Sequence, residues 1–355
     1  MDSDRPIPTP PTAVVLPRAN PPVHTSLFLG PDGLRPFWAL LLYLAILLCP
    51  VLLLGLASHL ASPDAPQPHP TGLSQLSPLV TGTTEWLQFG FVLFATWIMS
   101  RVEDRSVFTY GLREPRGSLR TASMGLLWGF LCMSLLIGVL WMTHHLVFTG
   151  VLLRPRAAFG YGAAWGLNFL GVGFFEEFLF RGYLQFVLAR CFAGLIRFLK
   201  PGAPYATAAG FWLAAILISF GFGLVHGSNP GESPVGLLCA GLAGLLFAFS
   251  LWRTGALWWA IGFHASWDWA QSFLFGVADS GTAAAGHLLD SHPAGPLLLS
   301  GGATGPEGSL FVLPVLLLVA LIIAFTLRGS AGYAAQSCIA ASPAIASPEL
   351  HAPPA

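Results

Sequence analysis

Residues 171–190 read GVGFFEEFLFRGYLQFVLAR, and the charged side chains of Glu176, Glu177 and Arg181 lie inside this apolar run. An ionised side chain near the centre of a membrane-spanning helix costs at least about 2.5–3.5 kcal/mol, so each of these groups is expected to have a partner or a function. Glu177 and Arg181 are four residues apart with the acid first, which is the favourable order for an ion pair on a helix. Glu176 projects roughly 100° away from Glu177 on a helix, so the pair leaves Glu176 free to act.

The composition of the whole chain indicates that this run lies in a membrane. Of the 355 residues, 54% are hydrophobic and 9% are charged, and the mean hydropathy is +0.69. Soluble domains carry about a quarter charged residues, so this chain has too few to cover the surface of a soluble globule. Lys and Arg number 16 and Asp and Glu number 16, which leaves no basic excess for a nucleic-acid partner. The sequence therefore predicts an all-α integral membrane protein.

Eight apolar stretches approach the roughly 20 residues that a membrane-spanning helix needs. They are residues 37–58, 85–100, 121–142, 163–190, 205–226, 234–252, 255–276 and 309–327. With the N-terminus inside, 13 of the 16 Lys and Arg residues fall on inner segments, and the outer loops hold only Arg154 and Arg156. Because basic residues mark the cytoplasmic side, we expect a multi-pass protein of the cell membrane with both termini cytoplasmic. Arg outnumbers Lys 15 to 1, which favours a bacterial inner membrane.

Two further spans carry polar or ionisable groups at an interval of four residues. Phe222 and His226 belong to the fifth span, and His264 and Asp268 belong to the seventh. Residues four apart lie on the same face of a helix, so spans four, five and seven each offer one polar face. The simplest arrangement places all three faces around one buried polar cavity.

The side chains expected in this cavity allow two kinds of chemistry. A glutamate beside a histidine in a low-dielectric cavity, here Glu176 with His226, is a good pair for activating water. His226, His264 and a carboxylate from Glu176 or Asp268 also match the three-ligand plan of a catalytic zinc site. The spacing alone does not separate these alternatives.

The three motifs, in this order and one per helix, resemble those of the CAAX-processing and bacteriocin-processing intramembrane endopeptidases. The resemblance covers about residues 165–275 and rests on Glu-Glu followed by Arg, on Phe222 before His226, and on His264 before Asp268. It implies that Glu176 and His226 activate water for peptide-bond cleavage. It also implies that His264 and Asp268 stabilise the oxyanion. Glu177, Arg181 and Phe222 would support the geometry.

Asp268 occupies a position where the family carries Asn or Asp. An ionised carboxylate cannot donate a hydrogen bond to an oxyanion, so Asp268 must be protonated, paired with His264 or bound to a metal. The family was first described as metal-dependent, and the mechanism later assigned to it, in which a glutamate activates water, needs no metal. We therefore expect no cofactor, with zinc as the alternative.

The chain is accordingly divided into six parts. We expect a disordered Pro-rich arm over 1–36, the first three membrane helices over 37–162, the protease core over 163–276, an outer loop over 277–308, the last membrane helix over 309–328 and a low-complexity tail over 329–355.

The predicted function is an intramembrane endopeptidase acting on a peptide or a membrane-anchored substrate, with the lipid bilayer as its surroundings. The alternatives are a membrane scaffold or regulator without turnover and, less favoured, a proton-coupled transporter. The predicted topology places His226 toward the outer face, whereas relatives that trim prenylated tails take their substrates from the cytosol. Either the cavity opens outward, or the substrate class differs, or the fifth span runs beyond His226.

Overall fold

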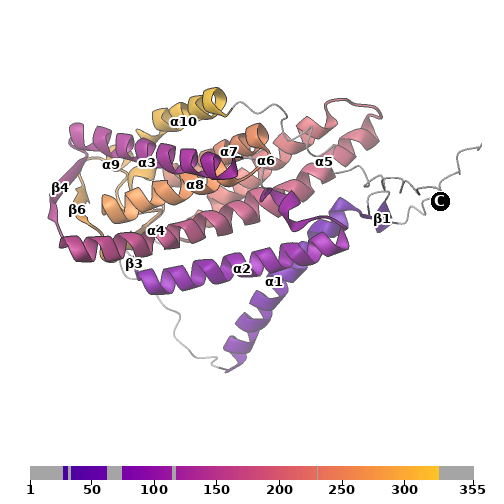
Figure 1. Cartoon of the computed structure of the whole chain (residues 1–355), viewed down its shortest axis with the longest axis horizontal. Coiled ribbons are helices and arrows are strands. Elements are labelled where there is room, and N and C mark those ends of the chain that lie inside the picture. The colour runs from indigo at the N-terminus through magenta and orange to yellow at the C-terminus, as the bar shows by residue number, and fades with distance from the viewer. Residues whose placement is uncertain (1–26, 31–32, 62–73, 114–116, 230, 328–355) are drawn as a thin grey trace, which may run out of the picture.

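The computed structural model describes residues 27–30, 33–61, 74–113, 117–229 and 231–327, and these are mostly helical (Figure 1). The α-helices of this part of the chain are α1 (Pro36–Ala61), α2 (Pro78–Val102), α3 (Ser118–Met142), α4 (Pro155–Glu177), α5 (Gln185–Leu199), α6 (Ala206–Val225), α7 (Pro234–Thr254), α8 (Trp258–Asp268), α9 (Leu297–Ser300) and α10 (Val312–Thr326).

Shorter elements connect or extend these helices. They are the 3₁₀ turns η1 (Val107–Tyr110), η3 (His226–Ser228) and η5 (Pro306–Gly308), the π-helical segments η2 (Phe178–Leu184) and η4 (Trp269–Leu274), and the strands β1 (Leu29–Gly30), β2 (Gly33–Leu34), β3 (Ser74–Leu76), β4 (Leu146–Val151), β5 (Thr282–Ala284) and β6 (Leu289–Pro293). The strands form three two-stranded sheets in the connecting segments.

Five helical stretches of the described chain are long and apolar enough to cross a membrane. They are Pro36–Ala61, Ser118–Met142, Pro155–Leu199, Ala206–Ser228 and Pro234–Thr254, and Val312–Thr326 is a shorter apolar helix. The helices α2 and α8 are not among them. Helix α2 carries a polar stretch over residues 81–85, and α8 has only 11 residues before it continues into η4. The protein is thus an all-α membrane protein.

The fourth predicted span, 163–190, is too short. The structure has one helical stretch of 45 residues from Pro155 to Leu199, in which η2 joins α4 to α5. A π-helical turn adds a residue without ending the helix, so the polar sequence at the end of the predicted span does not break it. The second predicted span, 85–100, is likewise too short, because α2 begins at Pro78.

The segments predicted to lack structure are partly ordered. Residues 27–34 of the expected arm contain the antiparallel pair β1–β2, and the Trp38 indole donates a hydrogen bond to the Leu27 carbonyl at 3.0 Å. Residues 1–26 of that arm and the whole expected tail over 329–355 lie outside the described residues. The expected outer loop over 277–308 contains β5, β6, α9 and η5.

Helix α8 is held between α3 and α4 through glycines. A Cβ on Gly125 or Gly129 of α3 would overlap the backbone of α8, and one on Gly262 of α8 would overlap the backbone of α3. On the other side, a Cβ on Gly173 of α4 would lie 2.9 Å from the Ile261 carbonyl oxygen. Small residues let membrane helices approach closely. This fit fixes the height and rotation of α8, the helix that carries His264.

The two ends of the helical bundle differ. At one end, β3 pairs with β5 and β4 pairs with β6 (Figure 1). We call this the strand end, formed by residues 74–77, 143–154, 226–229, 231–233 and 275–311. At the other end, Arg253 donates from Nε to the Leu327 carbonyl at 2.7 Å, and the Trp258 indole donates to the Arg113 carbonyl at 2.7 Å. We call this the arginine end, formed by residues 103–113, 117, 200–205 and 254–257.

Candidate active site

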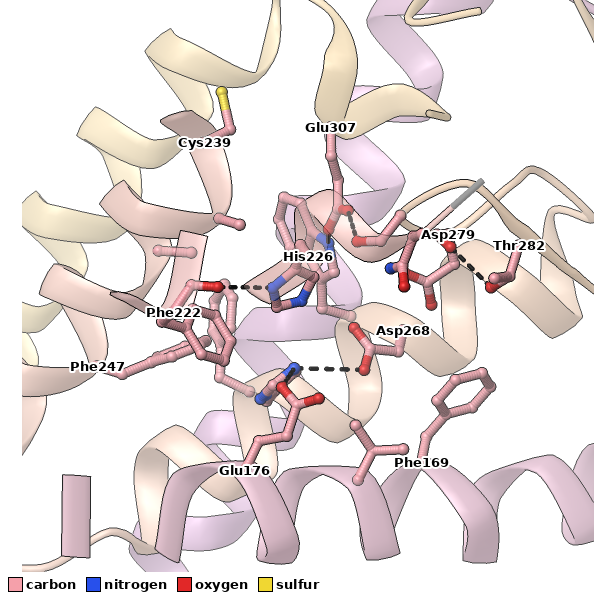
Figure 2. Close-up of a pocket in the computed structure, with 18 of the residues that line it drawn as sticks. Phe169, Glu176, Phe222, His226, Cys239, Phe247, Asp268, Asp279, Thr282 and Glu307 are labelled. Atoms are coloured by element: carbon pink, nitrogen blue, oxygen red, sulfur yellow. Dashed lines mark hydrogen bonds and ion pairs between the residues drawn. The ribbon is translucent and has the colours of Figure 1, made fainter. Parts of the chain in front are cut away.

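A cavity of about 230 Å³ lies between α2, α4, α6, α7, α8 and α10. Five of the seven residues singled out in the sequence line it, namely Glu176, Phe222, His226, His264 and Asp268. Figure 2 shows Glu176, His226 and Asp268 pointing toward one common space. The other two residues, Glu177 and Arg181, lie behind this wall and are fully buried.

Glu177 and Arg181 form the ion pair expected from their spacing. Arg181 Nη1 lies 3.0 Å from Glu177 Oε1, and both side chains are completely shielded from solvent. The Phe222 ring covers the guanidinium, with 4.0 Å between the Arg181 Cζ atom and the ring centroid. A cation over an aromatic face is attracted by the ring, more strongly where water is excluded. The pair therefore forms a closed, charge-balanced floor beneath the cavity.

His264 joins the floor to the cavity. Its Nδ1 lies 3.0 Å from Glu177 Oε1, and its Nε2 lies 3.7 Å from Glu176 Oε2 and 3.5 Å from Asp268 Oδ2. The imidazole stacks on the Phe247 ring, with the centroids 5.3 Å apart. Carboxylates accept hydrogen bonds and do not donate them, so a proton on each ring nitrogen satisfies all three contacts. Asp268 is thus paired with His264, one of the three states that the sequence left open.

The geometry explains why a phenylalanine precedes His226 by one helical turn. Helix α6 ends at Val225, and the His226 Nδ1 lies 2.8 Å from the Phe222 carbonyl oxygen. A carbonyl only accepts, so Nδ1 carries the hydrogen and the neutral ring has its lone pair on Nε2. The Phe222 ring meets the imidazole edge-on at 4.7 Å between centroids. Phe222 therefore fixes both the orientation and the tautomer of His226.

Helices α4 and α8 both change from α-helix to π-helix directly after the residues that face the cavity. The segment η2 starts at Phe178, one residue after Glu177, and η4 starts at Trp269, one residue after Asp268. Single π-helical turns are frequent at functional sites because they shift the side chains that follow relative to those before. Periodicity in the sequence gave no sign of either segment.

The donor atoms do not fit the zinc alternative. Within the described residues, no group of three or more His, Cys, Asp or Glu side chains has an arrangement that could hold a metal ion. We therefore derive no step through a metal.

Three carboxylates that the sequence analysis missed also line the cavity: Glu85, Asp279 and Glu307. Glu85 is half-buried on α2 and makes no hydrogen bond or ion pair with the described part of the chain. Glu307 accepts from the Trp267 indole at 2.8 Å and from the Ser280 hydroxyl at 3.1 Å. The position of Glu85 at the edge of an apolar run could have marked it as a candidate cavity residue. Asp279 and Glu307 lie in the expected outer loop, where acidic residues are ordinary.

Asp279 lies close to the carboxylates of Asp268 and Glu307. Its Oδ2 accepts a hydrogen bond from the Ser272 hydroxyl at 2.9 Å. Burial first, and then the nearby carboxylates of Asp268 and Glu307, raise the pKa of Asp279 well above its usual range. Its carboxyl group is therefore easier to protonate than that of an exposed aspartate.

Comparison with known proteins supports the resemblance seen in the motifs. Residues 158–270 match the family model described as type II CAAX prenyl endopeptidase Rce1-like. No match to the chain was found among curated proteins or among solved structures. The matched segment contains all seven residues singled out in the sequence and excludes Glu85, Asp279 and Glu307. Through residues 158–270 the chain is therefore similar to the Rce1-like type II CAAX prenyl endopeptidases.

Proposed function

We propose that the protein is an intramembrane endopeptidase in which Glu176 and His226 activate a water molecule for attack on a peptide bond. The observation that carries this proposal is the convergence of Glu176, His226, His264 and Asp268 on one cavity inside an apolar helical bundle. Ionisable groups facing a cavity in a membrane protein are retained for function, because their burial is costly.

In the proposed reaction, water binds between the Glu176 carboxylate and the Nε2 lone pair of His226. Glu176 accepts a proton from the water while the oxygen attacks the carbonyl carbon of the substrate. The C–O bond forms and the carbonyl becomes a tetrahedral oxyanion. Glu176 then returns the proton to the amine nitrogen as the C–N bond breaks, which leaves a new carboxylate and a new amine terminus.

We assign His264 to the oxyanion and Asp268 to His264. The Nε2 of His264 faces the cavity beside Glu176, so its N–H is the donor available to a developing negative charge. Asp268, 3.5 Å from that nitrogen, keeps the ring protonated and oriented rather than contacting the oxyanion itself. Glu177 and Arg181 hold the ring from the other side.

The proposal includes the topology. We propose eight membrane spans, with α2 and the α8–η4 helix completing the set, and with both termini on the cytoplasmic side of a bacterial inner membrane. Helix α8 packs between α3 and α4, so it needs less apolar surface than a lipid-facing span, and α2 presents the exposed apolar side chains of Leu87 and Phe94 to its surroundings. The substrate is a peptide or a segment of a membrane protein, in an extended form because a helical peptide bond is shielded from attack.

The test uses the full chain reconstituted in proteoliposomes with a randomised, acetylated and amidated octapeptide library. Glu176→Gln and His226→Ala are each expected to reduce cleavage by about 10²–10⁴-fold, the usual contribution of a general base. Asp104→Asn is the matched control, because this exposed carboxylate lies at the arginine end. Cleavage by Glu176→Gln at the wild-type rate would contradict the proposal and leave the scaffold or transporter alternatives.

A further inference from the structure

The cavity lies at one end of the bundle. Helices α2 and α10 contribute residues from their first turns, whereas α6 and α8 contribute residues from their last turns. The 45-residue stretch from Pro155 contributes from its first half, up to Glu176. Because these helices alternate in direction, most of these contributions come from the half of the bundle nearer the strand end, and the innermost residues, such as Phe247 of α7, lie near the middle.

The connecting segments of the strand end complete the cavity wall. Leu76, Asn229, Asp279, Ser280, Thr282 and Glu307 all line it, and Figure 2 shows Asp279, Thr282 and Glu307 on the side of the cavity away from Glu176. None of the described residues of the arginine end lines the cavity. In that direction the floor is closed by the buried pair of Glu177 and Arg181 under the rings of Phe222 and Phe247.

The ends also differ in charge. In the described chain, the basic residues at or next to the arginine end are Arg101, Arg105, Arg113, Arg120, Arg190, Arg197, Lys200 and Arg253, whereas the strand end has only Arg154 and Arg156 beside it. Basic residues flanking membrane helices mark the cytoplasmic side. The arginine end is therefore the cytoplasmic end under the proposed topology.

We infer that the cavity opens to the non-cytoplasmic side of the membrane, and that the bond cleaved lies in a peptide or membrane-protein segment on that side. The fifth span ends at Ser228, only two residues beyond His226, so it does not bring the cavity back toward the cytosol. The inferred substrate class rests on the proposed protease activity, whereas the direction of opening rests on the proposed topology and not on that activity.

The direction of opening is tested by cysteine labelling in a bacterial host. Single-cysteine variants Thr81→Cys and Ser280→Cys, made without the five native cysteines, place thiols on two walls of the cavity. The probe is the membrane-impermeant cation methanethiosulfonate ethyltrimethylammonium, applied to spheroplasts and to inside-out vesicles. Ser106→Cys, exposed at the arginine end, is the control for the opposite side.

We expect both cavity thiols to react in spheroplasts and not in inside-out vesicles, and the control thiol to do the reverse. Reaction of either cavity thiol from the cytoplasmic side alone overturns the inference. Thiols that react only after denaturation in dodecyl sulfate also overturn it, because the cavity would then be closed to both sides. Labelling needs no turnover, so a loss of the proposed function and a loss of this inference are separate results.

The substrate side is tested by mapping the new termini that depend on Glu176. They are expected in segments outside the cytoplasm, and termini confined to cytoplasmic segments would overturn the inferred substrate class while leaving proteolysis intact.

Discussion

Glu177 Oε1 lies 3.0 Å from both Arg181 Nη1 and His264 Nδ1. This one oxygen therefore links the ion pair on the long helix to the histidine on α8. It fixes the ring of His264 so that the opposite nitrogen faces the cavity. The ion pair of Glu177 and Arg181 therefore acts on the reacting groups through His264.

The ion pair gives the first prediction. Arg181→Met leaves the buried Glu177 carboxylate with His264 as its one charged partner, and breaking this buried pair is expected to cost about 3–5 kcal/mol of the free energy of unfolding. The double variant Glu177→Gln with Arg181→Met removes both charges and is expected to be more stable than Arg181→Met alone. Thermal unfolding in detergent measures both. An Arg181→Met protein as stable as the wild type would show that the pair contributes nothing.

The space around Arg181 gives a second prediction. A Cβ on Gly244 of α7 would overlap Arg181 Nη2, so Gly244→Ala is expected to destabilise the protein by about 1–3 kcal/mol, the usual effect of overpacking. Gly138→Ala on α3 is the control, since nothing lies within 4 Å of its Cβ position. There the better helix former should be neutral or stabilising by up to about 1 kcal/mol. Equal effects at both glycines would argue against the overlap.

Asp268 distinguishes support of His264 from direct contact with the oxyanion. Asp268→Ala is expected to lower kcat by about 10–100-fold, the usual loss when a group that orients a catalytic histidine is removed. Asp268→Asn should lose less, because its amide oxygen is still an acceptor beside the His264 N–H. The readout is kcat and KM for one peptide substrate. A loss in KM alone for Asp268→Ala would point to substrate binding instead.

Asp279 predicts a dependence of stability on pH. Its pKa is raised in the folded protein by burial and by the carboxylates of Asp268 and Glu307. Above about pH 4, where an unfolded aspartate loses its proton, the folded state still binds that proton. Stability should therefore fall as pH rises toward the folded pKa. Asp279→Asn should flatten this fall, whereas Asp104→Asn should not. The measurement is the unfolding temperature as a function of pH from about pH 4 upward. The same slope of unfolding temperature against pH in Asp279→Asn as in the wild type would contradict the prediction.

The sequence predicts the reacting groups well because their spacing is local. The interval of four residues that joins Glu177 to Arg181 and Phe222 to His226 becomes a direct contact in the structure. Such contacts need only a helix, and the apolar composition made the helices predictable.

What the sequence did not reveal depends on long-range contacts. Asp279 and Glu307 reach the cavity because the segment after η4 folds back and pairs with β3 and β4, and no periodicity signals such short strands. The continuous stretch from Pro155 to Leu199 was missed because a π-helical turn has no sequence signature. Glu85 faces the cavity because α2 packs closely on Gly171 of α4, a contact that only the tertiary fold defines.

The central claim is tested most directly by comparing the terminal peptides of membrane proteins in cells that carry the wild type or Glu176→Ala. We expect a set of new termini that is present with the wild type and absent with Glu176→Ala. The control is Asp104→Asn, which should give the wild-type set. Glu103→Gln is unsuitable as a control because Glu103 contacts both Tyr110 and Arg190. Identical termini in all strains, with a deletion phenotype rescued by Glu176→Ala, would contradict proteolysis and favour a scaffold.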